Sequence, residues 1–389
     1  KLKPSKTILS VVIFLIFFII GLRGGIQLKP ITIVSAANYV KPSASPIILN
    51  STFTIIKTLG KKSLSEHNFM PLQQALSLYY PFFPDNNISK KTIDIVKPAK
   101  YNILLIIVES LSASHIAALN QYSFKSYTPY LDSIISVSAV FTRCYANAKR
   151  SIEALPAILS SIPALMETPY VNSEFVDNKT TSIPQLLNEN GYTTMFFHGG
   201  KNGTMQFDSY SAKTGIKYYY GLNEYPNNKE DYDGTWGIFD EQFLQFAAQK
   251  ISQHRQPFFA VIYTLSSHHP YKIPQKYKAT FMNNTPLQQS IQYTDMAIAK
   301  FFDKVKKSKW YDNTIFIITA DHTSEQNNNN ATIDNTFRIP LIIFGKSVKP
   351  HHDTTTITQH IDIMPLIADV VGVNNSFFCL GKSPLNYNK

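Results

Sequence analysis

The stretch NILLIIVE, residues 102–109, decides the fold: a run of aliphatic side chains ends in an acidic one. Four further apolar runs follow along the chain: TTMFFHG (193–199), FFAVIYTL (258–265), TIFIITAD (314–321) and PLIIFG (340–345). Stretches with helical patterns separate them, at 127–138, 151–161, 205–214, 238–252, 288–308 and 361–371. Strands that alternate with helices form parallel sheets, and continuous apolar strands are buried on both faces. The sequence therefore predicts an α/β fold with a mostly parallel sheet sandwiched by helices.

The composition excludes several classes of protein. With 44% hydrophobic and 16% charged residues in 389, the chain is neither disordered nor of low complexity. Its two cysteines, Cys144 and Cys379, exclude a disulfide scaffold and a clustered-thiolate zinc site, although one bridge between them stays open. The net charge of +11 comes from scattered Lys and Arg residues, so we expect no nucleic-acid partner and favour a membrane or an anionic substrate.

A membrane segment precedes the α/β pattern. The uncharged run TILSVVIFLIFFIIGL, residues 7–22, would span about 24 Å as a helix, and flanking Lys and Arg side chains can reach the interfaces. A signal peptide is the alternative, because lysines precede the run and Ser35, Ala36 and Ala37 are small. Arg23 and Lys29 lie between the run and these small residues, which favours a transmembrane helix.

Three segments follow from this pattern. We expect a transmembrane helix at 1–25, a Pro-, Ser- and Asn-rich juxtamembrane connector at 26–100, and a catalytic domain at 101–389. Since the chain begins at Lys1, we expect the helix to be the last of several in a longer protein.

Carboxylates and imidazoles follow the predicted strands directly. Glu109 ends the first strand, His198 and His268 follow two others, and Asp321 and His322 end a fourth. In open α/β sheets the carboxyl ends of the strands form the functional edge. Carboxylate oxygens with an imidazole nitrogen suit manganese, zinc or magnesium, so the sequence predicts a divalent metal site.

A nucleophile is predicted at the start of the helix 151–161. Ser151 stands at an N-cap position, where backbone N–H groups and the helix dipole favour an attacking oxygen and a phosphate. Without further context, ordinary capping is the favoured explanation of Ser151, and Lys149 and Arg150 are either phosphate-binding or simply solvated charges.

The motifs carry a resemblance to a known family. They are NILLIIVES, TPYLDSI, NAKRSIEALPAILSS, FFHGG, LSSHHPY, YDNTIFIITADHTS, RIPLIIFG and IDIMP, in that order. Together they resemble the sulfatase-type domain of the alkaline phosphatase superfamily, and within it the lipoteichoic acid synthase-like phosphoglycerol transferases. The resemblance extends from Tyr101 nearly to the end, and the leading helix and connector resemble that family's membrane portion.

The resemblance implies roles for these residues. Metal ligands, usually of manganese, would be Glu109, Asp321, His322 and Ser151, with Ser151 also the nucleophile at a position where Thr is common. The resemblance also implies that His198 and His268 lie around the phosphate and the substrate head group, with His268 also catalytic. Two further substrate-binding residues are predicted from the residues themselves: Arg150, by its charge beside Ser151, and Asn202, in a segment that could supply a different pocket. The sequence departs from the family where Gly200 replaces an acid and where Met205 and Phe207 replace a Trp and an Arg, which puts the details of substrate binding in doubt. Trp236 lies in a segment that could supply a different pocket.

By the same resemblance, the donor is phosphatidylglycerol and the acceptor is a polyglycerol phosphate chain or a glycan. The protein is expected in the bacterial cell membrane, with its catalytic domain outside the cytoplasm. The alternatives are a phosphoethanolamine transferase of the same superfamily and a catalytically silent domain that binds envelope polymers. A formylglycine sulfatase is disfavoured, because Ile-Glu-Ala-Leu follows Ser151 in place of that signature.

Overall fold

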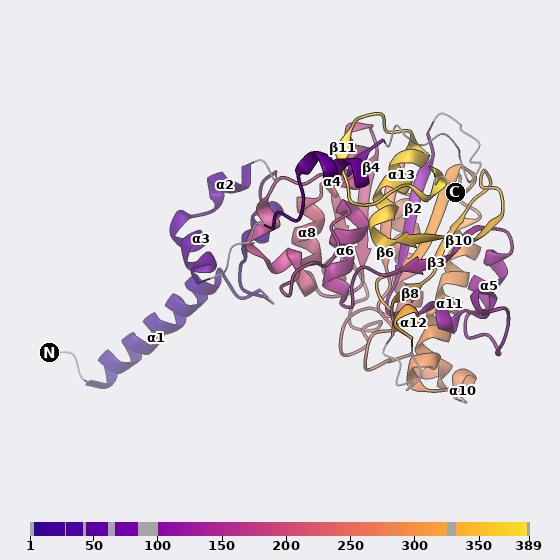
Figure 1. Ribbon diagram of the computed structural model, residues 1–389. Helices are drawn as coiled ribbons and strands as arrows, with labels where there is room; N and C mark the ends of the chain where they lie inside the picture. Colours follow the sequence, from indigo (N-terminus) through magenta and orange to yellow (C-terminus); the bar gives the residue numbers. More distant parts are fainter. Residues whose placement is uncertain are drawn as a thin grey trace.

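Four fully buried strands lie side by side at the centre of a nine-stranded sheet (Figure 1). The structure is a computed structural model, which describes residues 4–27, 29–41, 44–60, 67–84, 100–282, 284–324 and 332–386. In spatial order they are β7 (Thr314–Ala320), β2 (Asn102–Val108), β6 (Phe258–Tyr263) and β4 (Thr193–His198). All neighbouring pairs among them are parallel. The continuous apolar runs therefore form the buried parallel centre that the sequence predicts.

The outer strands complete the sheet on both sides. They are β5 (Tyr218–Tyr220) beside β4, and on the other side β9 (Leu341–Phe344), β3 (Ala139–Tyr145), β10 (His351–Gln359) and β8 (Arg338–Ile339). β9 runs antiparallel to both β7 and β3, and β8 runs antiparallel to β3. The sheet is thus mostly parallel, as expected, with antiparallel strands on one side only.

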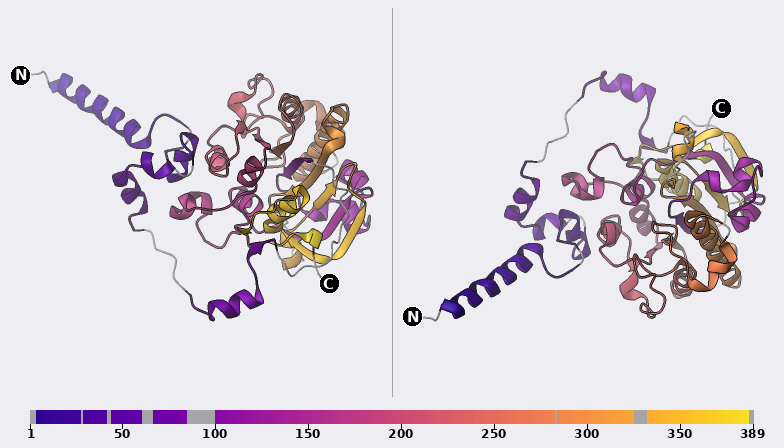
Figure 2. Two further views of the ribbon diagram at one scale, coloured as in Figure 1. Left: turned by 90° about the horizontal axis from the view of Figure 1, so that it is seen from above. Right: turned by 90° about the horizontal axis from the view of Figure 1, so that it is seen from below.

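Helices cover the two faces of the sheet (Figures 1 and 2). One group that packs together is α6 (Ser151–Ser160), α7 (Ile183–Glu189) and α13 (Ile363–Val371); the other is α5 (Pro129–Ile135), α9 (Asp240–Ile251) and α11 (Pro286–Val305). The predicted helix at 205–214 is divided into a 3₁₀ turn, Thr204–Gln206, and α8, Phe207–Lys213. The result is an α/β sandwich whose large core is rich in aromatic side chains.

The N-terminal helix α1 (Pro4–Arg23) projects from this body (Figures 1 and 2). Its stretch Ser5–Arg23 has a mean hydropathy of 2.5 and is not buried, so by length and composition it can cross a membrane. After it, the 3₁₀ helix η1 (Ile33–Asn38) packs on α8, and its Ala36 and Ala37 are buried. The small residues of the alternative signal-peptide reading are therefore folded against the main body.

The end of the connector is joined to the C-terminal segment. A two-stranded ribbon pairs β1 (Phe82–Phe83) with β11 (Phe377–Phe378), and the rings of Phe83 and Phe377 stack at 4.8 Å. Cys144 and Cys379 are both buried and free, so the bridge that the sequence left open is not formed.

Candidate active site

The predicted acidic and imidazole side chains meet at the carboxyl edge of the central strands. Glu109 follows β2, Asp321 and His322 follow β7, and His198 is the last residue of β4. Because these strands are parallel and close together in the sheet, their ends lie at one edge. The sheet topology therefore explains why residues more than 200 positions apart in sequence converge.

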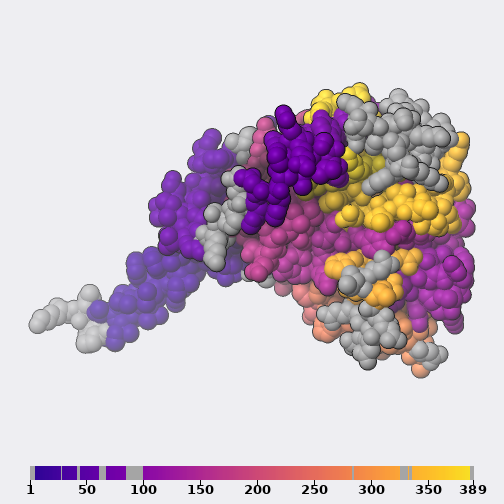
Figure 3. Space-filling model, in the orientation of Figure 1, coloured from indigo at the N-terminus to yellow at the C-terminus, as the bar shows by residue number. Residues whose placement is uncertain are grey.

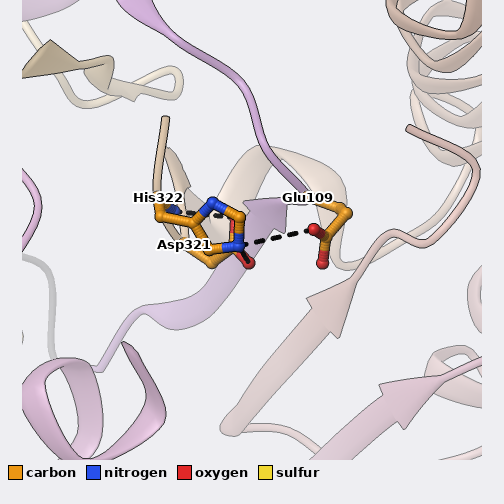
Figure 4. A group of neighbouring side chains, drawn as sticks. All are labelled: Glu109, Asp321 and His322. Atoms are coloured by element: carbon orange, nitrogen blue, oxygen red, sulfur yellow. Dashed lines mark hydrogen bonds and ion pairs between the residues drawn. The ribbon is translucent and has the colours of Figure 1, made fainter. Parts of the chain in front are cut away.

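Three of these side chains form a compact ligand set. One donor atom from each of Glu109, Asp321 and His322 lies within 4.8 Å of the other two, and the side chains point toward one another (Figure 4). His322 Nε2 lies 3.1 Å from Asp321 Oδ2 and 3.6 Å from Glu109 Oε1. The arrangement offers two hard oxygens and one nitrogen to a cation.

The hydrogen bonds around these ligands fix their orientation. His322 Nδ1 lies 2.9 Å from the carbonyl oxygen of Thr323, so it carries the proton and leaves Nε2 free as a ligand. The backbone N–H groups of Ser110 and His322 both donate to Asp321 Oδ1, at 2.7 and 2.8 Å. The Ser110 hydroxyl donates to Glu109 Oε1 at 2.7 Å. Ser110 holds this position with a φ of 53°, a strained conformation of the kind that gathers at functional sites.

The electrostatics of the site favour a bound cation. Burial raises the pKa of the Glu109 carboxyl well above its ordinary value, and the neighbouring carboxylate of Asp321 raises it further. Both carboxylates are almost fully buried. A divalent cation would offset the repulsion between them and the loss of hydration. The donor set and its charge therefore fit a metal ion.

Ser151 lies beside this ligand set, at the start of α6. Its Oγ is 3.2 Å from Glu109 Oε2 and 3.3 Å from His322 Nε2. The prediction that Ser151 is the N-cap is wrong by one residue: extended Arg150 is the N-cap and accepts the first helical bond from the N–H of Glu153. The Ser151 hydroxyl is directed to the ligands instead, so capping does not account for it.

Tyr263 is a further site residue, which the sequence analysis did not identify. Its hydroxyl donates to Asp321 Oδ2 at 2.6 Å, from the last residue of β6. The residue is hidden within an apolar run, FFAVIYTL, that predicts only a buried strand. One signal was available: a buried tyrosine hydroxyl needs a partner, and this one stands at the functional end of its strand.

His198 lies under the site as a neutral imidazole. Burial and, to a smaller extent, the nearby His268 together lower its pKa to about 3. Its ring packs edge-on against Phe207 at 5.1 Å and Tyr263 at 5.7 Å, and its Nδ1 has no partner among the described residues. His198 can therefore donate or accept a hydrogen bond near neutral pH, but it cannot carry a positive charge there.

The departures from the family pattern have a structural reason. A Cβ at Gly200 would lie 2.6 Å from Cε1 of His198, so the buried ring leaves no room for the acid that the synthases have there. Phe207 is fully buried against the same ring, and is part of the core.

A second segment lines the site beside His268. Gly200 bridges to Gly237, and the N–H of Ile238 donates to the Gly199 carbonyl at 3.0 Å. This pairing brings Trp236 over His268, with ring centroids 4.2 Å apart. The Trp236 indole N–H donates to the His269 carbonyl at 2.7 Å. The segment around Trp236 therefore contacts a predicted substrate-binding residue, and its role in a substrate pocket stays a prediction.

The other two predicted substrate residues have protein partners. The Arg150 guanidinium pairs with the Glu153 carboxylate and donates to the Glu167 carbonyl at 3.1 Å. The Asn202 amide donates to both carboxylate oxygens of Glu224 at 3.2 Å.

The comparisons with known proteins identify the family of the chain. A family model described as Sulfatase matches residues 101–373. Lipoteichoic acid synthase 1 of Bacillus subtilis is 27% identical over 221 residues, which are 51% of this chain and 34% of that protein. Phosphoglycerol transferase I of Escherichia fergusonii is 24% identical over 322 residues, 76% of this chain and 40% of that protein. The chain therefore spans only about a third to a half of the length of its curated relatives.

Solved structures share the fold. A protein in the alkaline phosphatase superfamily from Vibrio parahaemolyticus has a TM-score of 0.70 and 26% identity, over 82% of this chain and 80% of that one. The lipoteichoic acid synthase LtaP from Listeria monocytogenes has a TM-score of 0.63 and 20% identity, over 77% and 79%, which is a likeness of fold. With its alkaline phosphatase-like sheet and the family match over most of its length, the chain belongs to the sulfatase family.

Proposed function

We propose that this protein is a metal-dependent membrane phosphoglycerol transferase, which moves glycerol phosphate from phosphatidylglycerol to a polyglycerol phosphate or glycan acceptor. The observation that carries the proposal is the Ser151 hydroxyl, placed at a helix N-terminus and 3.2 to 3.3 Å from two side chains of the ligand set. The relatives that are lipoteichoic acid synthases and phosphoglycerol transferases support the same class of reaction.

Glu109, Asp321 and His322 would hold the metal, with Ser151 Oγ beside it. Manganese is expected from the resemblance, and the ligand types also suit magnesium or zinc. A bound divalent cation lowers the pKa of a nearby hydroxyl and offsets charge on phosphoryl oxygens.

The reaction would proceed by two displacements. Ser151 loses its proton, and Oγ attacks the phosphorus of the lipid headgroup as the bond to the diacylglycerol oxygen breaks. Diacylglycerol leaves with a proton, and glycerol phosphate stays on Ser151. An acceptor hydroxyl then attacks the same phosphorus, loses its proton and releases the Ser151 oxygen, which is protonated again.

Other residues of this chain would bind and orient the phosphoryl group. The N-terminal N–H groups of α6 favour an anion beside Ser151. Neutral His198 would give a hydrogen bond, which leaves His268 as the imidazole for proton movement. Arg150 would have to exchange its bond to Glu153 for one to the substrate.

The same proposal includes the division of the chain into segments and the location of the protein in the cell. Residues 1–25 would span the bacterial cell membrane, 26–100 would connect, and 101–389 would form the catalytic domain outside the cytoplasm. The lipid donor explains such a tether, because anchoring keeps the site near the membrane and raises the effective concentration of the donor.

Turnover with defined lipids tests the proposal. The full chain is incubated with manganese, a polyol acceptor and either phosphatidylglycerol or phosphatidylethanolamine, and diacylglycerol release is measured. We expect release from phosphatidylglycerol, with Ser151→Ala slower by roughly a thousandfold or more. Ser160→Ala, a buried serine at the other end of α6, is the matched control and should keep its activity.

Two other outcomes would contradict the proposal. Release from phosphatidylethanolamine alone would make the protein a phosphoethanolamine transferase. Binding of anionic polymer without release from either lipid, and unchanged by Ser151→Ala, would make it a silent envelope-binding domain.

A further inference from the structure

The connector after α1 exposes an unusual number of large apolar side chains. We use the name collar for η1 (Ile33–Asn38), α2 (Ser45–Ile48) and α3 (Ser51–Thr58), with the described residues that flank them, 31–41 and 44–59 in all. Six of its large apolar side chains are between 45% and 84% exposed: Tyr39, Ile47, Ile48, Ile55, Ile56 and Leu59. Exposed apolar side chains in such number indicate an interaction surface.

The charge of this region is of one sign. The first 65 residues contain nine Lys and Arg residues and no Asp or Glu. Lys29, Lys41 and Lys57, which belong to the collar or flank it, are exposed. Basic side chains next to exposed isoleucines suit a bilayer with anionic headgroups. The lysines can contact the headgroups, and the isoleucines can contact the apolar layer beneath them.

The collar also encloses a cavity of about 250 Å³. Ala36 and Tyr39 of the η1 side face Ile48, Leu49 and Phe53 of the α2 and α3 side across it.

Three side chains in the wall of this cavity, Thr32, Ser35 and Asn50, have hydrogen-bond partners within the protein. Asn50 Oδ1 accepts from the N–H groups of Thr52 and Phe53, at 2.8 and 3.3 Å. Thr32 and Ser35 bond to each other, and the Thr32 hydroxyl also donates to the Gln206 side chain. The rest of the wall is mostly apolar, which suits a hydrocarbon chain.

The position of the collar supports the same occupant. The N–H of Ile31 donates to the Arg23 carbonyl at 3.0 Å, so the chain folds back at the end of α1. In the space-filling view the collar lies between α1 and the main body (Figure 3). If α1 crosses a membrane, the collar stands at its interface with water.

The collar is also joined to the active-site edge. Asn38 of η1 donates to the Ser209 hydroxyl of α8 at 2.9 Å. Gln206, which binds Thr32, has a φ of 58° in the turn between His198 and α8. The wall of the cavity is therefore hydrogen-bonded, through Thr32, to the turn that follows the end of β4.

We propose that the collar is a lipid-binding device, seated in the interface of an anionic bilayer, whose cavity takes one acyl chain of a phospholipid. The isoleucines of α2 and α3 enter the acyl boundary, and the lysines lie among the headgroups. The inference rests on the proposed membrane anchoring by α1, but not on the group that is transferred. Its readout is lipid contact rather than turnover, so its failure and failure of the proposed reaction are distinguishable.

The depth of spin labels in a vesicle bilayer tests whether the collar lies in the membrane interface. The two native cysteines are buried, so a spin label attaches selectively to a new cysteine in the variant Ile56→Cys. The control variant is Met282→Cys. Met282 is 68% exposed and follows α10 (Lys278–Phe281), at the far end of the molecule from the collar. The full chain is placed in vesicles of phosphatidylcholine and phosphatidylglycerol. We expect the label at 56 to be open to oxygen and closed to a water-soluble nickel complex, and the label at 282 to behave in the opposite way. Equal access of nickel to both labels would overturn the proposal.

Photochemical labelling tests the cavity. A phosphatidylglycerol with a photoreactive group in its acyl chain is added to the same vesicles, and labelled peptides are mapped by mass spectrometry. We expect adducts on α1 and on Ile48 or Phe53, and loss of the adduct on Phe53 in Ile48→Trp, where the larger ring fills the cavity while α1 stays labelled. Adducts on α1 alone, or crosslinks between collars of two copies in place of lipid adducts, would overturn it.

Discussion

At the scale of single residues, Tyr263 is the side chain that orients Asp321. Tyr263→Phe removes the hydroxyl that donates to Asp321 Oδ2 and leaves the ring in the core. Because such outer partners fix ligand orientation, we expect manganese affinity to fall roughly 10- to 100-fold, measured by calorimetric titration with the metal alone.

Tyr192→Phe is the matched control for this change. Tyr192 is equally buried, but its hydroxyl donates at 2.8 Å to the Tyr101 carbonyl, just before β2 and so at the opposite edge of the sheet. Equal metal affinity in the two variants would show that Tyr263 serves packing only.

His360 gives the fold a defined dependence on pH. It is fully buried, its Nε2 donates to the Ala320 carbonyl at 2.7 Å, and Nδ1 accepts from the Asn147 N–H at 3.2 Å. Burial lowers its pKa to about 4 in the folded protein, while the unfolded chain takes up a proton near 6.5. The stability that neutral His360 contributes is therefore complete above pH 6.5 and is lost as the pH falls toward 4.

His360→Gln isolates this contribution, since glutamine can keep the bond to Ala320. The difference in unfolding free energy between the wild type and the variant should shrink by about 1.4 kcal/mol per pH unit between pH 6.5 and 4. Urea unfolding at a series of pH values measures it. A difference that does not change with pH would refute the assignment.

At the scale of elements, the segment that carries Trp236 packs on His268, a predicted substrate-binding residue. Trp236→Leu removes the ring that packs on His268, and we expect kcat/KM for the lipid donor to fall roughly three- to tenfold. Tyr218→Leu breaks a comparable pair, Tyr218 with His254 at 4.4 Å, at the outer strand β5. If both variants lost activity equally, the effect would be one of stability and not of the site.

The central strands were predictable from sequence, and several outer elements were not. A strand buried on both faces is a continuous apolar run, which is how β2 and β7 were recognised. β10 contains HHDTTTITQ and is half exposed, so no apolar run marks it. The antiparallel direction of β9 was also beyond prediction, because a buried strand has the same composition in both directions.

The candidate site shows the same limit. Glu109, Asp321 and His322 could be predicted because they directly follow strands that end at one edge. Tyr263 lies near the end of an apolar run that predicts a buried strand, so the sequence indicates that its hydroxyl needs a partner but not that the partner is Asp321. The φ of 53° at Ser110 is not marked in the sequence at all.

At the scale of the whole molecule, the basic and apolar collar is hydrogen-bonded to α8 and to the turn before it, which follow the sheet edge that carries the candidate site. The double substitution Ile55→Asp with Ile56→Asp places charge where the collar would enter the bilayer, so we expect a higher KM for phosphatidylglycerol in vesicles. Activity toward a water-soluble diester with the same headgroup should stay unchanged, with Met282→Asp as control. A loss with both substrates would indicate misfolding rather than a lost membrane contact.

The central claim is that Ser151 carries the transferred group. Intact-mass and peptide mass spectrometry on the full chain, after incubation with manganese and either phosphatidylglycerol or phosphatidylethanolamine, tests it most directly. The account predicts a glycerophosphoryl adduct on Ser151 with phosphatidylglycerol only, and none when EDTA is added first. An adduct on another residue, an adduct with phosphatidylethanolamine only, or turnover without any adduct would contradict it.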